Sequence, residues 1–285
     1  YEKKKDRTDM KPQTLDIGKI NEFSVVDVDR QGAWLDAGCE RLLLPKQELT
    51  QMVSVGDLLR VFVYRDQDGD VQATLKLPLA TAGEFAALRV KKIEAEGVLF
   101  ELGRGFELPV AIDEIPFRPK PGERTLVRVE LDEDGNLCGS CRITDFLETS
   151  RDLKFGQQVE LMVWRTTDLG VKMIINDRYE GLLYADEPID SQIGQTLVGF
   201  VARLREDGKV DLSLNPGGKA GADIGRDKIL QALAGSGFLP LNDSSSPEEI
   251  RRLLGLSKKQ FKRSLGSLYK QGKVELLQTG IRLKT

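Results

Sequence analysis

The chain has 285 residues, of which 31% are charged, and its formal net charge is −3. Three cysteines and no histidine favour a reducing cytoplasm over a disulfide-stabilised secreted protein, and they leave few ligands for zinc. No apolar run approaches the roughly 18 residues of a membrane span, so we expect no membrane partner. Residues 1–14 are predicted to be a disordered leader, and Met10-Lys11-Pro12 resembles a natural start.

A hairpin signal recurs three times along the chain. Asp-Gly occurs at residues 68–69, 134–135 and 207–208, each time between two alternating apolar runs. This is the strongest short-range signal of a β-hairpin, because glycine tolerates the positive φ of a tight turn. A spacing of about 70 residues is too long for a solenoid repeat and suits small five-stranded barrels. The chain is therefore predicted to be a tandem array.

The first repeat shows the strand order of an OB-fold barrel. Its predicted strands are Ile17–Val28, Ala33–Asp36, Arg41–Leu44, Leu58–Tyr64 and Val71–Leu77, with a short helix or loop in Pro45–Val55. The predicted fold class is multidomain, with three small all-β OB-fold five-stranded barrels followed by an α+β winged-helix domain. The predicted boundaries are 15–79, 80–150 (divergent) and 151–215 for the barrels, 216–223 for a linker and 224–285 for the winged helix.

The C-terminal segment changes period from two to 3.6. Residues 224–236 place Ile229, Leu230, Leu233 and Phe238 at helical spacing. Ser246 and Ser257 are predicted N-caps of two further helices, which end at Gly255 and Gly272. A closing hairpin is predicted at 273–277 and 280–283, which gives the helix–helix–helix–wing order of a winged helix.

Charge is distributed unevenly between the predicted domains. Each barrel carries more Asp and Glu than Lys and Arg, whereas residues 224–285 carry 12 basic and 5 acidic side chains. The third predicted helix has an apolar stripe of Phe261, Leu265 and Leu268. The opposite stripe is basic and comprises Lys259, Arg263, Gly266 and Lys270, flanked by Lys258 and Lys262 and followed by Lys273. No acid lies between Lys258 and Lys273. This pattern predicts contact with phosphates; a solvated helix face or a partner-docking face is the alternative.

Two of the repeats resemble the RNA-binding repeat of ribosomal protein S-one. The first matches through Gly18-Lys19-Ile20, Gly32-Ala33-Trp34-Leu35-Asp36, Arg41-Leu42-Leu43-Leu44 and Val55-Gly56-Asp57. The third matches through Gly156-Gln157-Gln158-Val159, Gly170-Val171-Lys172-Met173, Glu180-Gly181-Leu182-Leu183-Tyr184 and Ile193-Gly194-Gln195. The middle repeat matches least, and we expect it to space or pack the others rather than to bind.

The resemblance implies where nucleic acid would bind. The family uses an aromatic on strand two and a His or aromatic at the end of strand three, on which bases stack. Residue matching puts these positions at Trp34 and Leu44, at Leu99 and Val110, and at Lys172 and Tyr184. Lys46, Arg60, Lys172 and Arg178 are candidate phosphate contacts. Alternation puts Ala33 and Leu35 in the core and Trp34 outside, although a strand Trp is more often core.

No motif supports catalysis or a cofactor. Cys138-Gly139-Ser140-Cys141 lies in a predicted strand, where residues three apart face opposite ways, and no second Cys or His pair completes a zinc site. Gly103-Arg104-Gly105 lacks the Lys-Ser/Thr of a nucleotide loop. The acids lie mostly in turns. We therefore predict a non-enzymatic protein with no cofactor and no metal.

The domain order resembles, from about residue 15 onward, that of the CvfB family of bacterial RNA-binding regulators. The resemblance implies a cytoplasmic protein that binds single-stranded RNA and acts on gene expression after transcription. Two alternatives remain at this point. One is a DNA-binding transcription regulator whose barrels dock protein partners, and the other is a scaffold associated with ribosomes or nucleases.

Overall fold

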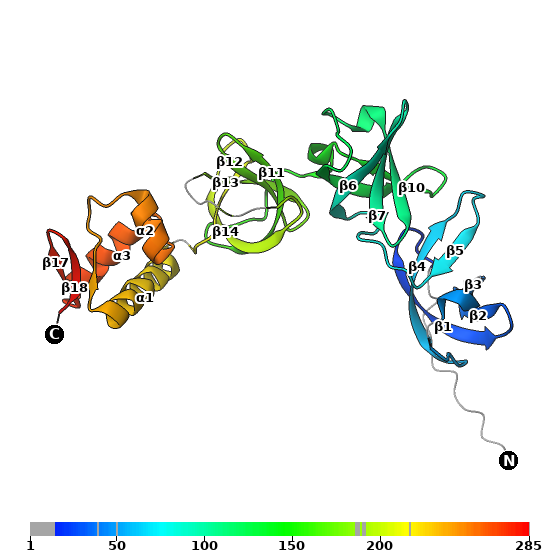
Figure 1. Cartoon of the computed structure of the whole chain (residues 1–285), viewed down its shortest axis with the longest axis horizontal. Coiled ribbons are helices and arrows are strands. Elements are labelled where there is room, and N and C mark those ends of the chain that lie inside the picture. Colours follow the sequence, from blue (N-terminus) through cyan, green and yellow to red (C-terminus); the bar gives the residue numbers. More distant parts are fainter. Residues whose placement is uncertain are drawn as a thin grey trace, which may run out of the picture. The chain divides into compact units, whose positions relative to one another are not determined.

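A computed structural model describes residues 15–38, 40–49, 51–185, 189, 192–216 and 218–284, so the predicted leader lies outside the described residues. The chain divides into two compact units, Tyr1–Phe146 and Leu147–Thr285. The first unit holds two five-stranded sheets, and the second holds a closed five-stranded barrel and a helical domain (Figure 1). The predicted fold class, small five-stranded barrels followed by an α/β winged helix, is confirmed.

Barrel 1 comprises β1 (Ile20–Val28), β2 (Gly32–Asp36), β3 (Arg41–Pro45), the 3-10 turn η1 (Lys46–Glu48), β4 (Leu58–Arg65) and β5 (Val71–Thr74), in the sheet order β3-β2-β1-β4-β5. Alternate residues of β1 and β2, including Phe23, Ala33 and Leu35, fill its core. In the described residues the gap between β3 and β5 carries no strand pairing. Instead Oε2 of Glu48 accepts hydrogen bonds from Thr74 Oγ1 (2.5 Å) and Leu75 N (2.8 Å) across it.

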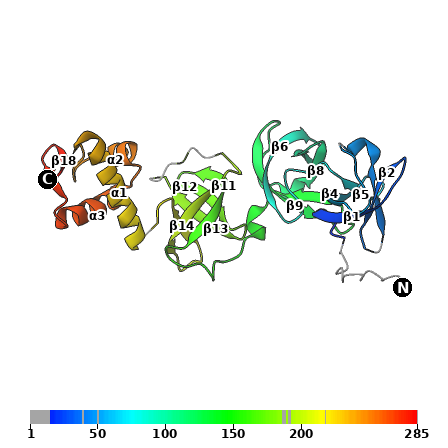
Figure 2. The same ribbon diagram turned by 90° about the horizontal axis from the view of Figure 1, so that it is seen from below.

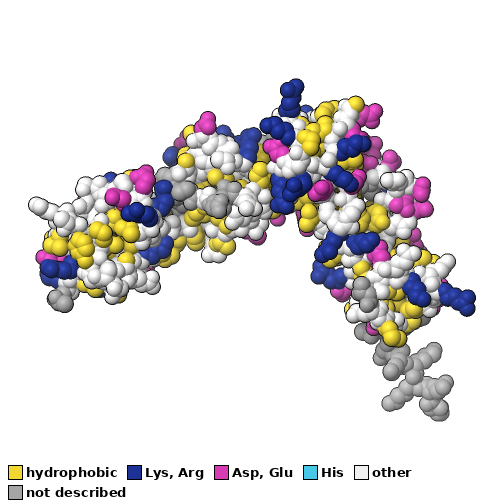
Figure 3. Space-filling model, viewed as in Figure 1, with side chains coloured by type: hydrophobic (Ala, Val, Ile, Leu, Met, Phe, Trp, Pro, Cys, Tyr) yellow, Lys and Arg dark blue, Asp and Glu magenta, His cyan; other side chains and the backbone are white. Residues whose placement is uncertain are grey.

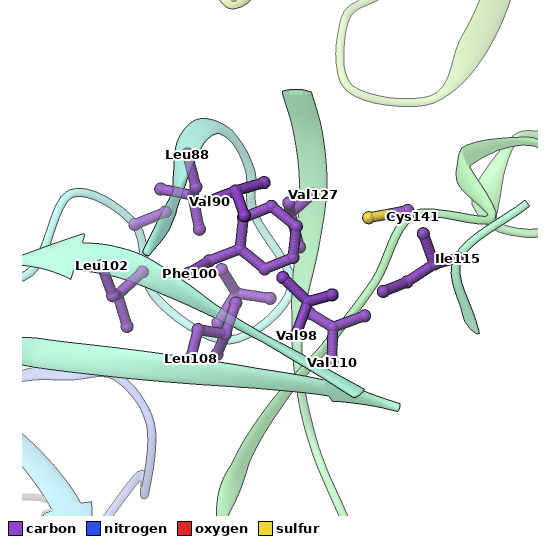
Figure 4. Close-up of a cluster of buried hydrophobic side chains, with 12 residues drawn as sticks. Leu88, Val90, Val98, Phe100, Leu102, Leu108, Val110, Ile115, Val127 and Cys141 are labelled. Carbon is purple, nitrogen blue, oxygen red and sulfur yellow. The ribbon is translucent and has the colours of Figure 1, made fainter. Parts of the chain in front are cut away.

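Barrel 2 repeats this plan. It comprises β6 (Phe85–Ile93), β7 (Gly97–Gly103), β8 (Phe106–Ala111), η2 (Ile112–Glu114), β9 (Arg124–Leu131), β10 (Leu137–Ser140) and η3 (Ile143–Phe146), in the order β10-β9-β6-β7-β8. Its core surrounds Phe100, with Val98, Val110 and Val127 about the ring (Figure 4). The last strand, β10, ends at Ser140, and the 3-10 turn η3 follows from Ile143.

Barrels 1 and 2 pack into one unit through backbone and aromatic contacts. Leu79 N donates to Leu102 O (2.8 Å), and Ala82 N donates to Gly18 O (2.8 Å). The Phe106 ring meets the rings of Phe62 and Tyr64 edge-on, with centroids 5.4 and 5.1 Å apart. Both ribbon views show these sheets side by side (Figures 1 and 2).

Barrel 3 comprises β11 (Gln158–Thr167), β12 (Gly170–Ile175), β13 (Tyr179–Tyr184), β14 (Thr196–Leu204) and β15 (Val210–Ser213), and parallel pairing of β13 with β15 closes it. The predicted Asp-Gly hairpins join β4 to β5, β9 to β10 and β14 to β15. Their glycines, Gly69, Gly135 and Gly208, have φ of 85°, 83° and 78°. The hairpin predictions are therefore confirmed.

The C-terminal domain comprises α1 (Gly218–Ser236), β16 (Phe238–Leu239), α2 (Pro247–Leu254), α3 (Lys258–Lys270), β17 (Val274–Leu277) and β18 (Gly280–Leu283), with the sheet order β16-β18-β17. Ser246 and Ser257 cap α2 and α3 through capping boxes with Glu249 and Gln260, as their sequence positions predict. A shared core of α1, α2, α3 and the sheet encloses Phe261 and Leu268.

Two sequence expectations differ from the structure of this domain. Helix α1 begins at Gly218, inside the predicted linker 216–223. Glycine costs only about 1 kcal/mol relative to alanine within a helix, so composition alone misplaced this start. Phe238 lies on strand β16 after Gly237, whose φ of 69° ends the helix, and it does not extend the apolar face of α1.

Candidate nucleic-acid interface

Strand register fixes which residues occupy equivalent places in the three barrels. The glycine that opens the second strand is paired with the last residue of the third, as Gly32 with Pro45, Gly97 with Ala111, and Gly170 with Tyr184. The counterparts of Tyr184 are therefore Pro45 and Ala111. The assignment of Leu44 and Val110 to this position is wrong by one residue. Their side chains are 0% and 2% exposed and belong to the barrel cores.

Trp34 lies on the outer side of β2, as the alternation predicts. Its neighbours Ala33 and Leu35 are 0% exposed, whereas the indole is half-buried and outside the core cluster. The indole Nε1 donates to Oδ2 of Asp29 (2.9 Å), and this hydrogen bond, with one from Gln31 N, holds the pKa of Asp29 below its usual value. The ring is thus anchored at its nitrogen edge. An anchored aromatic on a strand face is suited to stack against a base.

The first strand of each barrel carries a bulge at the same place. The register shifts lie between Val25 and Asp27, between Val90 and Lys92, and between Val163 and Arg165. In barrel 3 the bulged residue is Trp164, where the other barrels have Val26 and Lys91. Such bulges re-aim side chains at functional sites.

The buried indole of Trp164 lies beside Lys172, the strand-two counterpart of Trp34 in barrel 3. Lys172 Nζ lies 5.2 Å and the Arg165 guanidinium 4.8 Å from the indole centroid. Lys172 also pairs with Glu180 (2.5 Å), so its charge is largely neutralised. The indole is 9% exposed. The sequence analysis assigned Trp164 no binding role, because a bulge cannot be read from alternation.

Tyr184 stands at the end of β13 and is 39% exposed. Its hydroxyl donates to Oδ1 of Asp211 (3.3 Å), which also lies 3.8 Å from Arg205. The ring is therefore held at its hydroxyl end, in the manner of Trp34. Residues two apart on a strand share a face, so Tyr184, Leu182 and Glu180 lie along the same face of β13. The Glu180–Lys172 ion pair is therefore on the face that carries Tyr184.

The other predicted phosphate contacts in the barrels differ in availability. Arg178 pairs with Glu148 (2.8 Å) and Asp152 (3.5 Å), and the pKa of Glu148 is lowered by the Arg178 hydrogen bond. Lys46 is exposed directly after Pro45. Arg60 is exposed, and its register partner on β1 is Glu22, five residues from the Asp27 that faces Trp34. That separation is about 16 Å along a strand, so the structure does not bring Arg60 to Trp34.

Helix α3 presents the predicted basic stripe. Phe261, Leu265 and Leu268 are buried, and the opposite face exposes Lys259, Arg263, Gly266 and Lys270. Lys262 lies 4.0 Å from Asp243, Lys258 is half-buried and Lys273 is exposed. Among the described side chains, no ion pair is recorded for Lys259, Arg263 or Lys270. In unit 1, by contrast, Lys and Arg are intermixed with Asp and Glu on the face drawn in Figure 3.

The cysteines and acids form no metal-binding cluster in the described part of the chain. Cys138 and Cys141 are free thiols, and burial raises the pKa of Cys141 to about 12. No group of three or more potential metal-ligating side chains is found among the described residues. No described helix is long and apolar enough to cross a membrane.

These features define a tandem array of OB-type barrels with a C-terminal winged helix. Residues 227–283 match the CvfB-like winged helix domain, and residues 17–76 match the S1 domain. The resemblance to the CvfB family that the sequence indicated is thereby confirmed. Barrels of this kind and winged helices are nucleic-acid-binding domain types, which supports nucleic-acid binding by this chain.

Similarity to known proteins extends over most of the chain. An uncharacterized protein, YitL of Bacillus subtilis, is 29% identical over 264 residues, which is 87% of this chain and 88% of the relative. Conserved virulence factor B of Staphylococcus aureus is 25% identical over 240 residues, with 80% and 79% covered. A solved multidomain protein with nucleic acid binding domains from Streptococcus pneumoniae is 26% identical, covers 94% of this chain and 98% of its own, and has a TM-score of 0.41.

Proposed function

We propose that this chain is a non-enzymatic protein that binds single-stranded RNA and acts in the cytoplasm after transcription. The observation that carries the proposal is the anchored outer-face aromatic of barrel 1, Trp34, on an S1-type barrel. An aromatic face stacks on unpaired bases, which a base-paired duplex does not offer. Tyr184 supplies an exposed aromatic at the corresponding end of barrel 3.

Helix α3 adds the electrostatic part of the site. The barrels carry net negative charge, so each of them alone should bind a polyanion weakly. The basic α3 stripe adds phosphate contacts to those of the barrels. Joining weak modules on one chain makes the later contacts intramolecular and raises affinity by a factor of about 10²–10⁴ without any new contact.

A competition experiment on the full chain tests the proposal. A labelled, unstructured single-stranded RNA is bound to the protein and then titrated with unlabelled RNA of the same sequence or with duplex DNA of matched length. We expect the single-stranded RNA to displace the label at a much lower concentration than the duplex. Preferential displacement by duplex DNA would favour the second candidate, a DNA-binding regulator, whose support is the basic helix of a winged-helix domain.

A further inference from the structure

A hollow of about 650 Å³ lies where barrels 1 and 2 meet in unit 1. Its walls come from the end of β3 and η1, from the segment that follows β5, and from the β7–β8 turn of barrel 2. Volumes of this size are typical of sites that hold a small ligand. The hollow opens beside the β3–β5 gap, which in barrel 3 is closed by strand pairing.

The hollow continues the outer face that carries Trp34. Trp34 and Leu43 are paired across β2 and β3, and so are Gly32 and Pro45 two residues along. Residues two apart on a strand share a face, so Pro45 lies on the same face as Trp34. Pro45 lines the hollow. A single-stranded RNA that stacks a base on Trp34 and continues along this face reaches the hollow next.

Two cations border the hollow. Lys76 and Arg104 are exposed, and the ion pairs recorded among the described residues involve neither of them. The one acid of the lining, Glu48, already accepts two hydrogen bonds from Thr74 and Leu75 through Oε2. Leu75 and Leu77 give the remaining wall an apolar character. An apolar wall with two cations at the rim suits a nucleotide, which has a flat base and an anionic phosphate.

Arg104 occupies a turn position that ordinarily selects other residues. Gly103 pairs with Phe106, so Arg104 and Gly105 form a two-residue hairpin loop, with φ of 54° and 92°. Positive φ at both positions favours Asn-Gly, and an arginine there is strained. The turn is also fixed in place, because Leu79 N donates to Leu102 O and the Leu79 side chain packs against Gly103. A strained and fixed arginine at the rim of a hollow indicates a functional constraint rather than a turn requirement.

We propose that this hollow binds one nucleotide of the single-stranded RNA, with Lys76 and Arg104 on its phosphate. Barrels 1 and 2 then form one continuous site, and the middle barrel contributes a cation instead of an aromatic. This inference rests on the proposed function, since it takes the RNA strand past Trp34 as given.

Arg104→Asn in the full chain is the test. Asparagine suits the turn better than arginine, so the variant should melt at or above the temperature of the parent. Affinity is measured by fluorescence anisotropy with a single-stranded oligouridylate of about 30 nucleotides, enough to span several barrels. Losing one phosphate contact should lower the salt slope of log K by about 0.7, which corresponds to about fivefold weaker binding at 0.1 M salt. Lys76→Gln should act alike, and the exposed Arg118→Asn of barrel 2 should have no effect.

The outcomes separate this inference from the proposed function. If the parent does not bind the oligonucleotide, both are overturned. If the parent binds and Arg104→Asn retains the same affinity and salt slope, the hollow is not a subsite, while RNA binding by the chain stands. A variant that melts lower and binds more weakly with an unchanged salt slope also overturns the inference, because Arg104 would then be structural.

Discussion

Replacing Trp34 by alanine separates a binding role from a structural one. Trp34 is half-buried outside the core, so its loss removes one hydrogen bond to Asp29 and partial packing. We expect the Trp34→Ala substitution to lower the free energy of unfolding by about 1.5 kcal/mol or less, whereas truncating a core aromatic such as Phe23 would lower it by roughly 3–5 kcal/mol. Base–aromatic stacking is worth about 1–3 kcal/mol, so affinity for single-stranded RNA should fall by about 5- to 150-fold.

The assay uses the chain's own fluorescence. The chain contains two tryptophans, so Trp164→Phe leaves Trp34 as the single reporter. We expect its emission to be quenched when RNA is added, and Trp34→Phe to retain most of the affinity because it keeps a ring. The matched control is Leu99→Ala, at the same register position of barrel 2, where an aliphatic side chain offers no stacking surface. Equal RNA affinity of Trp34→Ala and the parent would refute the role that we assign to this face.

Three further predictions concern other parts of the chain. The double variant Lys259→Glu/Arg263→Glu should weaken the binding of all nucleic acids alike and lower the salt slope of log K for single strands by about 1.4 or more. The control variant Arg252→Glu/Lys284→Glu makes the same charge change and should have neither effect. Equal effects of the two variants would show that only net charge matters. The pKa values of Asp66 and Asp132 are lowered, chiefly by hydrogen bonds from the Gln72 side chain and the Asn136 backbone respectively, so the stability that these carboxylates contribute is present above the ordinary carboxyl pKa and is lost as pH falls through the lowered pKa. Between pH 6 and pH 3, about the carboxyl range, the melting temperature should therefore fall less steeply for Asp66→Asn/Asp132→Asn than for the parent. Identical slopes would contradict this. With its pKa at about 12, Cys141 should resist alkylation at neutral pH in the folded chain and react on unfolding, and rapid native labelling mapped to Cys141 would show that its burial is not maintained.

Short-range signals predicted most of the fold. The Asp-Gly turns, the alternation around Trp34 and the caps at Ser246 and Ser257 each depend on residues within a few positions of one another. The start of α1 was missed because glycines weaken a helix without forbidding it.

The candidate site was harder to predict, because its geometry depends on strand pairing. Leu44 and Pro45 differ by one place, and only their partners across the sheet decide which faces outward. The position of the Trp164 indole depends on a β-bulge, and the hollow depends on how barrels 1 and 2 pack against each other. Neither leaves a periodic signal in the sequence.

Ultraviolet cross-linking of the full chain to a long unstructured RNA, with mapping of the cross-linked peptides, tests the central claim most directly. The account predicts cross-links at the strands that carry Trp34 and Tyr184 and on helix α3, all reduced by competing single-stranded RNA. Cross-links confined to α3, or none on either barrel face, would contradict it.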